Sequence, residues 1–240
     1  MEMTLKSNIN YDCLTCKHTG KAFCSLQIDD KIIFSETKKD IFLKKGEIIF
    51  KENNFPTGVY AIYNGKIKIS KLGEEGKEQI VRFAKSGDLI GYRSILSEDH
   101  YHASATALSD VKLCHIPRVN FIDSLKNNFR LNNYILKKLS TDLKKAEEKI
   151  LSISQKSAKE RIAETLILLH HEFGKKDNSS INVKLSRKEI GNIAGSTIET
   201  TIRTLSEFKK EGIIQFEGKD IIVNDITKLI NIANMHSLVH

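Results

Sequence analysis

The stretch that decides the fold runs from Leu185 to Ile214 and reads LSRKEIGNIAGSTIETTIRTLSEFKKEGII. It contains two S-x-x-E patterns, which begin at Ser186 and Ser196. Each predicts a capping box, in which the hydroxyl accepts from a free backbone N–H and the carboxylate reaches back to the cap. Gly195 lies between the two patterns, and glycine commonly ends a helix. Two helices joined by so short a turn predict a helix-turn-helix.

The residues on either side of this motif complete a domain. On the C-terminal side, apolar runs at Ile213–Phe216 and Ile221–Val223 flank a turn at Glu217-Gly218-Lys219. Such a pattern predicts a β-hairpin, which would form a wing. On the N-terminal side, SAKERIAETLILLHHEFG predicts an amphipathic helix that ends at Gly174. We therefore expect a winged helix-turn-helix in residues 155–240.

In a helix-turn-helix, the N-terminal residues of the second helix meet base edges in the major groove. Arg203 could pair with guanine O6 and N7, and Glu199 could accept from a cytosine amino group. Alternatively, Glu199 only caps the helix at Ser196, and Arg203 is only a solvated surface charge. The residues expected near the duplex are Ser186, Arg187, Ser196, Thr197, Ile198, Glu199, Thr200, Ile202 and Arg203.

Before this domain, the chain from about Asn127 to Ser154 contains no Pro or Gly. Apolar residues recur there at alternating steps of three and four, as in a helix that pairs with a second copy of itself. This seam comprises Leu136, Leu139, Leu143, Ala146, Ile150 and Ile153. An ordinary core stripe is the alternative. In a homodimer, two reading helices would meet a palindromic site on double-stranded DNA, about 34–36 Å apart.

Residues 41–116 read as short strands separated by glycine turns, with no helical pattern between them. The pair Asn64-Gly65 predicts a two-residue hairpin. Many strands at this spacing favour an antiparallel barrel or jelly roll. We predict an α+β protein with an N-terminal cysteine segment (1–30), an antiparallel β-roll (31–120), a long dimerisation helix (121–154) and the winged helix-turn-helix.

Three of the four cysteines, Cys13, Cys16 and Cys24, lie within twelve residues, and Cys114 is distant. The N-terminus has no apolar core of signal-peptide length, and no apolar run reaches the roughly 20 residues that a membrane span needs. We expect a cytoplasmic protein without a membrane partner, whose cysteines are metal ligands or reactive thiols rather than disulfides. The net charge of +8 is spread along the chain; it is compatible with a polyanionic partner and also with an ordinary solvated surface.

Several segments resemble the CRP/FNR transcription regulators, and within them the oxygen-sensing FNR branch. They are EQI…F…GDLIGYRSIL, ALSDVKLCHIP, SAKERIA and the opening stretch, in the family's order and spacing. The resemblance implies a β-roll like a cyclic nucleotide-binding domain, a dimerisation helix and a winged helix. Glu199 and Arg203 match the positions that read a TTGAT-like or TGTGA-like half-site. Ile198 favours the TTGAT-like site, whereas Ile202 departs from the small polar residue usual there.

The same resemblance also indicates which group would sense the signal. Cys114 matches the family's distant fourth cluster ligand, so Cys13, Cys16, Cys24 and Cys114 would hold a [4Fe–4S] cluster. Phe23 matches an apolar position that would shield it. Zinc also accepts four thiolates, and thiol chemistry or a small molecule is a further alternative. Seven residues separate Cys16 from Cys24, whereas FNR has five.

The cyclic-AMP-binding members carry Gly-Glu and Arg-Ser where this chain has Gly91-Tyr92 and Tyr101-His102. Without an arginine for the phosphate, we expect no cyclic AMP. In regulators of this class, the charged segment Gly73 to Gln79 could contact RNA polymerase; it also fits an ordinary solvated turn.

An enzyme is the main alternative of another class, because cupins are jelly rolls with a His-x-His motif. His100 and His102 have that spacing, yet no Glu follows at the required distance. The sequence has no phosphate loop and no nucleophile elbow. We therefore expect no enzymatic activity.

Overall fold

The computed structural model describes residues 13, 16, 35–174, 180–218 and 220–235, with only the backbone of Glu75. Most of the predicted cysteine segment, 1–30, lies outside these residues. The chain forms two compact units, one of residues 1–77 and 81–142 and the other of residues 78–80 and 143–240.

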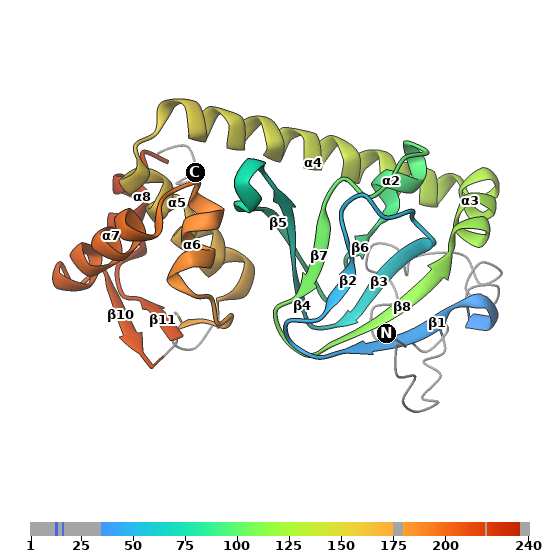
Figure 1. Ribbon diagram of the computed structural model, residues 1–240, viewed down its shortest axis with the longest axis horizontal. Helices are drawn as coiled ribbons and strands as arrows, with labels where there is room; N and C mark the ends of the chain where they lie inside the picture. The colour runs from blue at the N-terminus through green and yellow to red at the C-terminus, as the bar shows by residue number, and fades with distance from the viewer. Residues whose placement is uncertain (1–12, 14–15, 17–34, 175–179, 219, 236–240) are drawn as a thin grey trace. The chain divides into compact units, whose positions relative to one another are not determined.

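The first unit is a roll of two four-stranded antiparallel sheets (Figure 1). One sheet has the order β1-β8-β3-β6 and the other β2-β7-β4-β5. The strands are β1 (Lys39–Leu43), β2 (Ile48–Phe50), β3 (Gly58–Asn64), β4 (Lys66–Leu72), β5 (Glu78–Lys85), β6 (Leu89–Ile90), β7 (Ser104–Ala107) and β8 (Val111–Pro117). The 3₁₀ turn η2 (Glu74–Gly76) joins β4 to β5.

The hairpin predicted at Asn64-Gly65 is wrong. Strands β3 and β4 belong to different sheets, so the chain crosses from one sheet to the other at this point. Gly65 has a φ of +115°, whereas Asn64 is not among the residues with positive φ, as a type I′ turn would require. A Cβ on Gly65 would lie 2.4 Å from Val111 Cγ1. The glycine is therefore explained by the close approach of β8.

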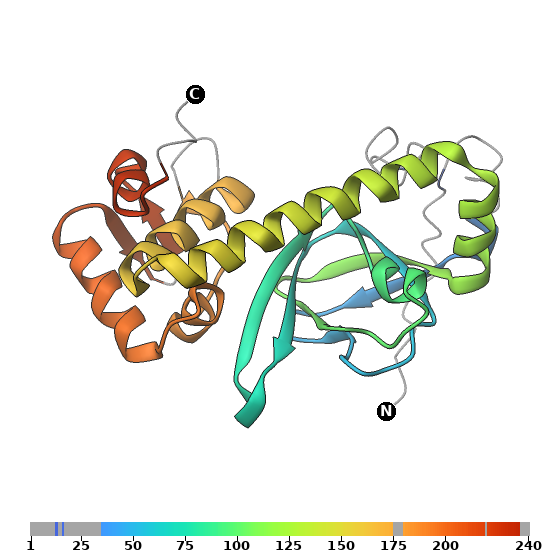
Figure 2. The same cartoon turned by 90° about the horizontal axis from the view of Figure 1, so that it is seen from above.

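The predicted helix 121–154 is divided in two. Helix α3 (Arg118–Asn127) follows β8 directly, and α4 (Phe129–Gln155) follows α3 after a sharp corner (Figure 2). The break falls at Asn128, whose φ of −125° and ψ of 100° are extended. Its Oδ1 accepts from Leu131 N at 2.9 Å, which satisfies a free N–H at the start of α4.

The core beneath these helices joins the roll to the first half of α4. Leu131 and Ile135 are buried with Val59, Phe121 and Ile95. Ile95 belongs to the short helix α2 (Tyr92–Leu96), which begins at Gly91 with a φ of +86°. The first half of α4 is therefore part of the roll's hydrophobic core.

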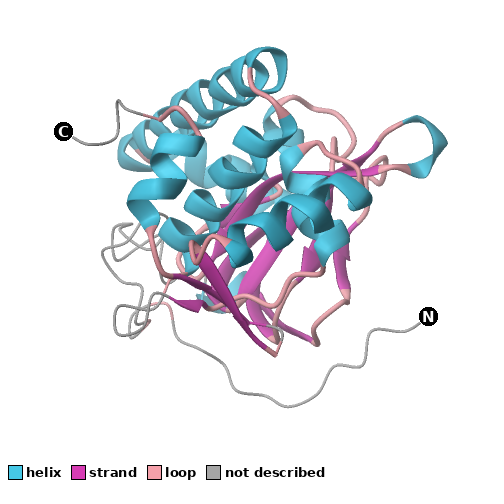
Figure 3. Cartoon of the chain, turned by 90° about the vertical axis from the view of Figure 1, so that its left-hand side faces the viewer, coloured by secondary structure: helices cyan, strands magenta, loops and turns pink. Residues whose placement is uncertain are grey.

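The second unit contains helices and one small sheet (Figure 3). The helices are α5 (Ala158–Phe173), α6 (Arg187–Ala194), α7 (Ile198–Lys210) and α8 (Ile226–Ile232). The sheet has the order β10-β11-β9, from β9 (Ser180–Ile181), β10 (Ile214–Glu217) and β11 (Asp220–Val223). Pairing of β10 with β11 confirms the predicted wing, and the α+β class is confirmed. None of the helices in the described residues is both long and apolar enough for a membrane span.

Candidate DNA interface and sensor site

Local sequence fixes both ends of α6. Ser186 Oγ accepts from Glu189 N at 3.2 Å, and Ser186 N donates to Glu189 Oε2 at 2.9 Å, which is the predicted capping box. Gly195 ends the helix with a φ of +63°, which glycine adopts most readily. A Cβ on Gly191 would lie 2.9 Å from Thr201 Oγ1, so glycine here permits the close packing of α7 on α6.

Helix α7 begins one residue later than the sequence pattern predicts. Its N-cap is Thr197, whose Oγ1 accepts from Thr200 N at 3.2 Å. Ser196 Oγ instead donates to Thr197 O at 3.4 Å. The predicted Ser196–Glu199 capping box is therefore wrong, because Thr197 supplies the cap. The Glu199 carboxylate is left available for another partner.

Four large side chains are exposed on the N-terminal half of α7, while its buried face packs into the unit. They are Ile198, Glu199, Ile202 and Arg203, and the buried residues are Thr201, Thr204, Leu205 and Phe208. Within the part of the chain that the structure describes, neither Glu199 nor Arg203 makes a hydrogen bond or ion pair. Thr200 is half-buried, and its hydroxyl accepts from Thr197 Oγ1 at 3.1 Å.

Two other predicted DNA-facing residues have internal partners. Ser186 caps α6, as described above. The guanidinium of Arg187 lies 3.9 Å from the centre of the Phe216 ring on the wing strand β10. Burial lowers the pKa of Arg187. This stacking attaches the first turn of α6 to the wing.

Two cations that the DNA-interface prediction did not include hold the C-terminus of α6. Lys149 Nζ, from α4, donates to Ile193 O at 2.9 Å. Arg161, from α5, donates through Nε to Ala194 O at 2.8 Å and through Nη2 to Gly195 O at 3.0 Å. These carbonyls form the negative end of the helix dipole, where cations are favourable. Together the two side chains fix the turn that precedes α7; we call them the turn clamp.

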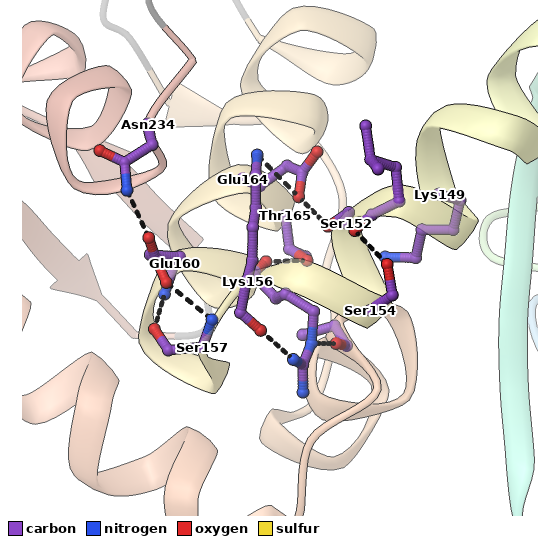
Figure 4. A network of polar contacts seen from close by, with 12 residues as sticks. Lys149, Ser152, Ser154, Lys156, Ser157, Glu160, Glu164, Thr165 and Asn234 are labelled. Carbon is purple, nitrogen blue, oxygen red and sulfur yellow. Dashed lines mark hydrogen bonds and ion pairs between the residues drawn. The ribbon is translucent and has the colours of Figure 1, made fainter.

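A polar network supports the clamp where α4 ends and α5 begins (Figure 4). Ser152 donates to Glu164, and Lys156 lies 3.5 Å from the same carboxylate. Ser157 caps α5 in a capping box with Glu160. Burial lowers the pKa of Lys149, and the Glu164 carboxylate opposes this shift. Sequence reasoning missed Lys149 because it is one lysine of many on a charged helix.

The predicted seam on α4 is mostly exposed. Leu136 and Ile150 are 62% and 68% exposed, and Leu143 and Ile153 are exposed as well. Ala146 is exposed, whereas Leu139 is partly buried against the roll core. Leu151 is a further exposed apolar residue, outside the predicted seam. An exposed apolar stripe of this kind is typical of a surface that another helix covers.

Three of the predicted cluster ligands are half-buried: Cys13, Cys16 and Cys114; Cys24 lies outside the described residues. Cys114 is on β8, opposite Asp40 of β1 and Ala61 of β3. Burial raises the pKa of the Cys114 thiol to about 12, with Lys38 opposing and the charges of Cys13 and Cys16 adding to the rise. Cys114 therefore lies near enough to Cys13 and to Cys16 to interact with them electrostatically.

A buried cation lies beside these thiols. The Lys38 side chain is only 1% exposed, and its Nζ is 2.7 Å from Asp40 Oδ1. Although burial opposes it, the hydrogen bond to Asp40 and the charges of Cys114 and Cys13 raise the pKa of Lys38. A lysine in this position suits a group that gathers anionic thiolates. Within the described residues, no set of three His, Cys, Asp or Glu side chains converges on one metal ion.

An arginine–carboxylate cluster ties α4 to the roll. Asp142 Oδ2 accepts from Arg82 Nη1 at 2.9 Å and from Tyr92 Oη at 2.7 Å, and it lies 3.0 Å from Arg93 Nη2. Arg82 is on β5, and Tyr92 and Arg93 are on α2. Burial, together with Asp142, raises the pKa of Tyr92 to about 12. Tyr92 therefore binds the protein's own aspartate.

Tyr101, His100 and His102 lie together in the loop between α2 and β7. Tyr101 is buried and stacks on Phe50 with ring centres 4.0 Å apart. Its hydroxyl donates to Gly58 O at 3.3 Å. His100 is half-buried and His102 is exposed, and they lie 3.3 Å and 3.6 Å from the Asp99 carboxylate. Both histidines thus belong to a surface loop, as the sequence predicts.

Comparisons with known proteins agree with both units. The "Cyclic nucleotide-binding domain" family matches residues 40–128, and the "Crp-like helix-turn-helix domain" family matches residues 160–232. "Electron transport regulator A" of Shewanella oneidensis is 38% identical over 202 residues, which are 83% of this chain and 78% of that one.

A second relative and a solved structure extend the comparison. The "Fumarate and nitrate reduction regulatory protein" of Vibrio cholerae is 34% identical over 209 residues, 86% of this chain and 81% of that one. The structure of FixK2 from Bradyrhizobium japonicum covers 82% of this chain and 97% of its own, with a TM-score of 0.73 and 25% identity. The chain belongs to the CRP/FNR family of transcription regulators, DNA-binding proteins with a cyclic-nucleotide-binding-like roll.

Proposed function

We propose that this regulator acts in the cytoplasm as a homodimer that reads a palindromic operator with TTGAT-like half-sites. The observation that carries the proposal is the face of α7, where Glu199 and Arg203 are exposed without an internal partner in the described residues. Arg203 would donate to guanine O6 and N7, and Glu199 would accept from a cytosine amino group. The turn clamp would hold both at a fixed angle to α4.

Selection from a random duplex library tests the DNA part. The wild-type protein should enrich a two-fold symmetric sequence, and Glu199→Ala with Arg203→Ala should lose the preference at the G·C pair. Each lost contact should weaken operator binding by about 1–3 kcal/mol. An unchanged consensus in the double variant would contradict the proposal. The affinity should also fall steeply with salt, because phosphate contacts release counterions.

The dimer would form along α4, where the exposed apolar residues lie. Ile150→Lys places a charge in this stripe and should shift the protein toward monomer in analytical ultracentrifugation. Leu168→Lys is the matched control, because Leu168 is also an exposed apolar residue but lies on α5. Equal behaviour of the two variants would argue against a seam on α4.

We further propose that the signal is oxygen or another redox change. Cys13, Cys16, Cys24 and Cys114 would hold a [4Fe–4S] cluster, which supplies a redox-active centre that oxygen can degrade. The support is that Cys114 interacts electrostatically with Cys13 and Cys16, and that the buried ammonium of Lys38 interacts with Cys114 and Cys13. The names of the relatives, an electron transport regulator and a fumarate and nitrate reduction regulator, point the same way.

The route from these cysteines to the DNA would run through the backbone. β8, which carries Cys114, continues at Arg118 into α3 and then into α4. A tie between the N-terminal cysteines and β8 would therefore bias the position of α4. Such a bias is a population shift, limited by the difference in ligand stability between the two states. Phe50, Tyr60 and Tyr101 pack together inside the roll and disfavour cyclic AMP as the signal.

Protein isolated without oxygen tests the sensor. We expect iron and acid-labile sulfide at about four per chain, a brown colour, and loss of both from Cys114→Ser. Operator affinity should fall on exposure to air. Colourless protein that contains zinc, with affinity indifferent to air, would contradict the proposal and favour the zinc alternative.

A contact with RNA polymerase is a separate proposal. The turn η2 carries Glu74, and Lys77 follows it; both are exposed. Replacing both with alanine should reduce transcription from a target promoter without changing operator affinity. A solvated turn without a partner would leave both measurements unchanged.

A further inference from the structure

We propose that Ile198 and Ile202 read the C5-methyl groups of thymine in the operator, and so add an apolar part to its sequence specificity. This inference rests on the proposed function, because it assumes that α7 lies in the major groove. The observation behind it is the exposure of two large apolar side chains where a soluble helix ordinarily has polar ones.

The two isoleucines contrast with the other large apolar residues of α7. Ile198 is 42% and Ile202 48% exposed, whereas Leu205 and Phe208 are buried. The domain therefore does not need the isoleucines for its core. Burial of their exposed surface is left for an external partner.

Their spacing places them next to the polar reading residues. Ile198 and Ile202 are four residues apart, as are Glu199 and Arg203. Residues four apart lie on one side of a helix, one turn above the other. The exposed face of α7 therefore carries an apolar column and a charged column side by side. Both columns would face the same few base pairs.

Base chemistry then identifies the partner. In the major groove, every base edge offers donors or acceptors, and the only apolar group is the thymine methyl. An isoleucine side chain against a polar edge would remove water without replacing its hydrogen bonds. Against a methyl group, it would instead bury apolar surface on both sides. The apolar column thus favours thymines beside the G·C pair that Arg203 would read.

Isoleucine also suits this role because its side chain is stiff. A β-branched residue in a helix has one strongly preferred χ1 rotamer. Little side-chain entropy is then lost when the methyl contact forms. Thr200, which lies between the two isoleucines in the sequence, is half-buried and bonded to Thr197. It is therefore less suited to provide this contact.

The test uses the operator selected by the wild-type protein, with each thymine replaced in turn by deoxyuridine, which lacks only the methyl group. For the wild type, at least one replacement per half-site should weaken binding by about 3-fold to 10-fold. In Ile202→Ser or Ile198→Ser, the effect should vanish at the thymine that the residue contacts. If that thymine is replaced by cytosine, binding should weaken. If it is replaced by 5-methylcytosine, which restores the methyl group, part of the affinity should return, but only when the isoleucine is present.

Leu168→Ser is the matched control, because it removes another exposed apolar side chain of the same unit and should leave every deoxyuridine effect unchanged. If the wild type selects a clear operator but deoxyuridine changes binding by less than about 2-fold at every position, the inference is wrong and the proposed function stands. If no operator is selected at all, the proposed function itself fails. Circular dichroism shows whether the variants are folded.

Discussion

The two halves of α4 are held by opposite chemistry. In the first half, the carboxylate of Asp142 accepts from Arg82 and Tyr92, and Leu131 and Ile135 are buried in the roll core. In the second half, the ammonium of Lys149 donates to a backbone carbonyl of α6. One helix thus carries two polar contacts of opposite charge: an anionic tie to the roll through Asp142 and a cationic tie to α6 of the second unit through Lys149.

The two ties also differ in what they hold. Asp142 contacts three side chains from two elements, whereas Lys149 contacts one main-chain oxygen at the end of α6. A contact with side chains can be lost when one of them changes rotamer. A contact with a backbone carbonyl is lost only when the helix α6 itself moves. We therefore expect the first tie to control stability and the second to control the geometry of α7.

The largest effect is expected from Asp142→Asn. This change removes the charge while it leaves Arg82 and Arg93 in place, and Asp142 is only 12% exposed. Because the arginines are partly exposed, water offsets some of the loss, and the free energy of unfolding should fall by about 1.5–3 kcal/mol in a urea titration. The first tie would be unimportant if the decrease were within experimental error.

Glu148→Gln is the control for Asp142. It removes a charge of the same sign from the same helix, but Glu148 is exposed and pairs only at 3.9 Å with Lys144. Exposed pairs of this kind contribute about 0.3–0.5 kcal/mol. A control variant as unstable as Asp142→Asn would show that general helix charge, and not the cluster, is responsible.

A smaller effect is expected from Lys149→Met. The methionine fills similar space and removes a desolvated charge, so the loss of the hydrogen bond to Ile193 should cost only about 1 kcal/mol. Hydrogen exchange at the amides of residues 194–197 should nevertheless accelerate, and operator affinity should fall more than stability does. Lys145→Met, at an exposed position of α4, should change neither measurement. Unchanged exchange in Lys149→Met would show that Lys149 does not hold the turn before α7.

Features that depend on local sequence were predicted better than contacts such as these two ties. The capping box at Ser186, the glycine stop at Gly195 and the wing hairpin depend on residues close in sequence, and all three are confirmed. The second capping box was wrong because both Ser196 and Thr197 can cap a helix, and the pattern alone does not choose between them.

Contacts between residues that are distant in sequence could not be predicted from local sequence patterns. Lys149 and Ile193, or Asp142 and Arg82, are ordinary charged or apolar residues until the fold brings them together. The hairpin prediction at Asn64-Gly65 was wrong for the same reason, because the glycine is explained by the close approach of β8, which is distant in sequence. The exposed face of α7 was predictable because helical periodicity alone decides it.

An effect as small as that of Lys149→Met is expected at neutral pH from Tyr92→Phe, which removes one hydrogen bond to Asp142 and should cost about 1 kcal/mol. Its pH dependence makes it informative. The pKa of Tyr92 is raised to about 12 by burial and by the Asp142 carboxylate, with Arg82 and Arg93 opposing. An unfolded tyrosine ionises near a pKa of about 10. Between these values the folded state holds the proton more firmly, so the contribution of Tyr92 is complete below about pH 10 and is lost as the pH rises toward 12.

The free energies of unfolding of wild type and Tyr92→Phe should therefore converge as the pH rises from about 8 to about 11.5, and the variant should become the more stable protein at the alkaline end. Other groups that titrate in this range, such as the lysines, are present in both proteins, so their effects cancel in the difference. A difference that stays constant over the whole range would mean that Tyr92 ionises freely in the folded protein. The phenol would then not be held between the roll and the first half of α4, and the anionic tie would consist of the two arginines alone.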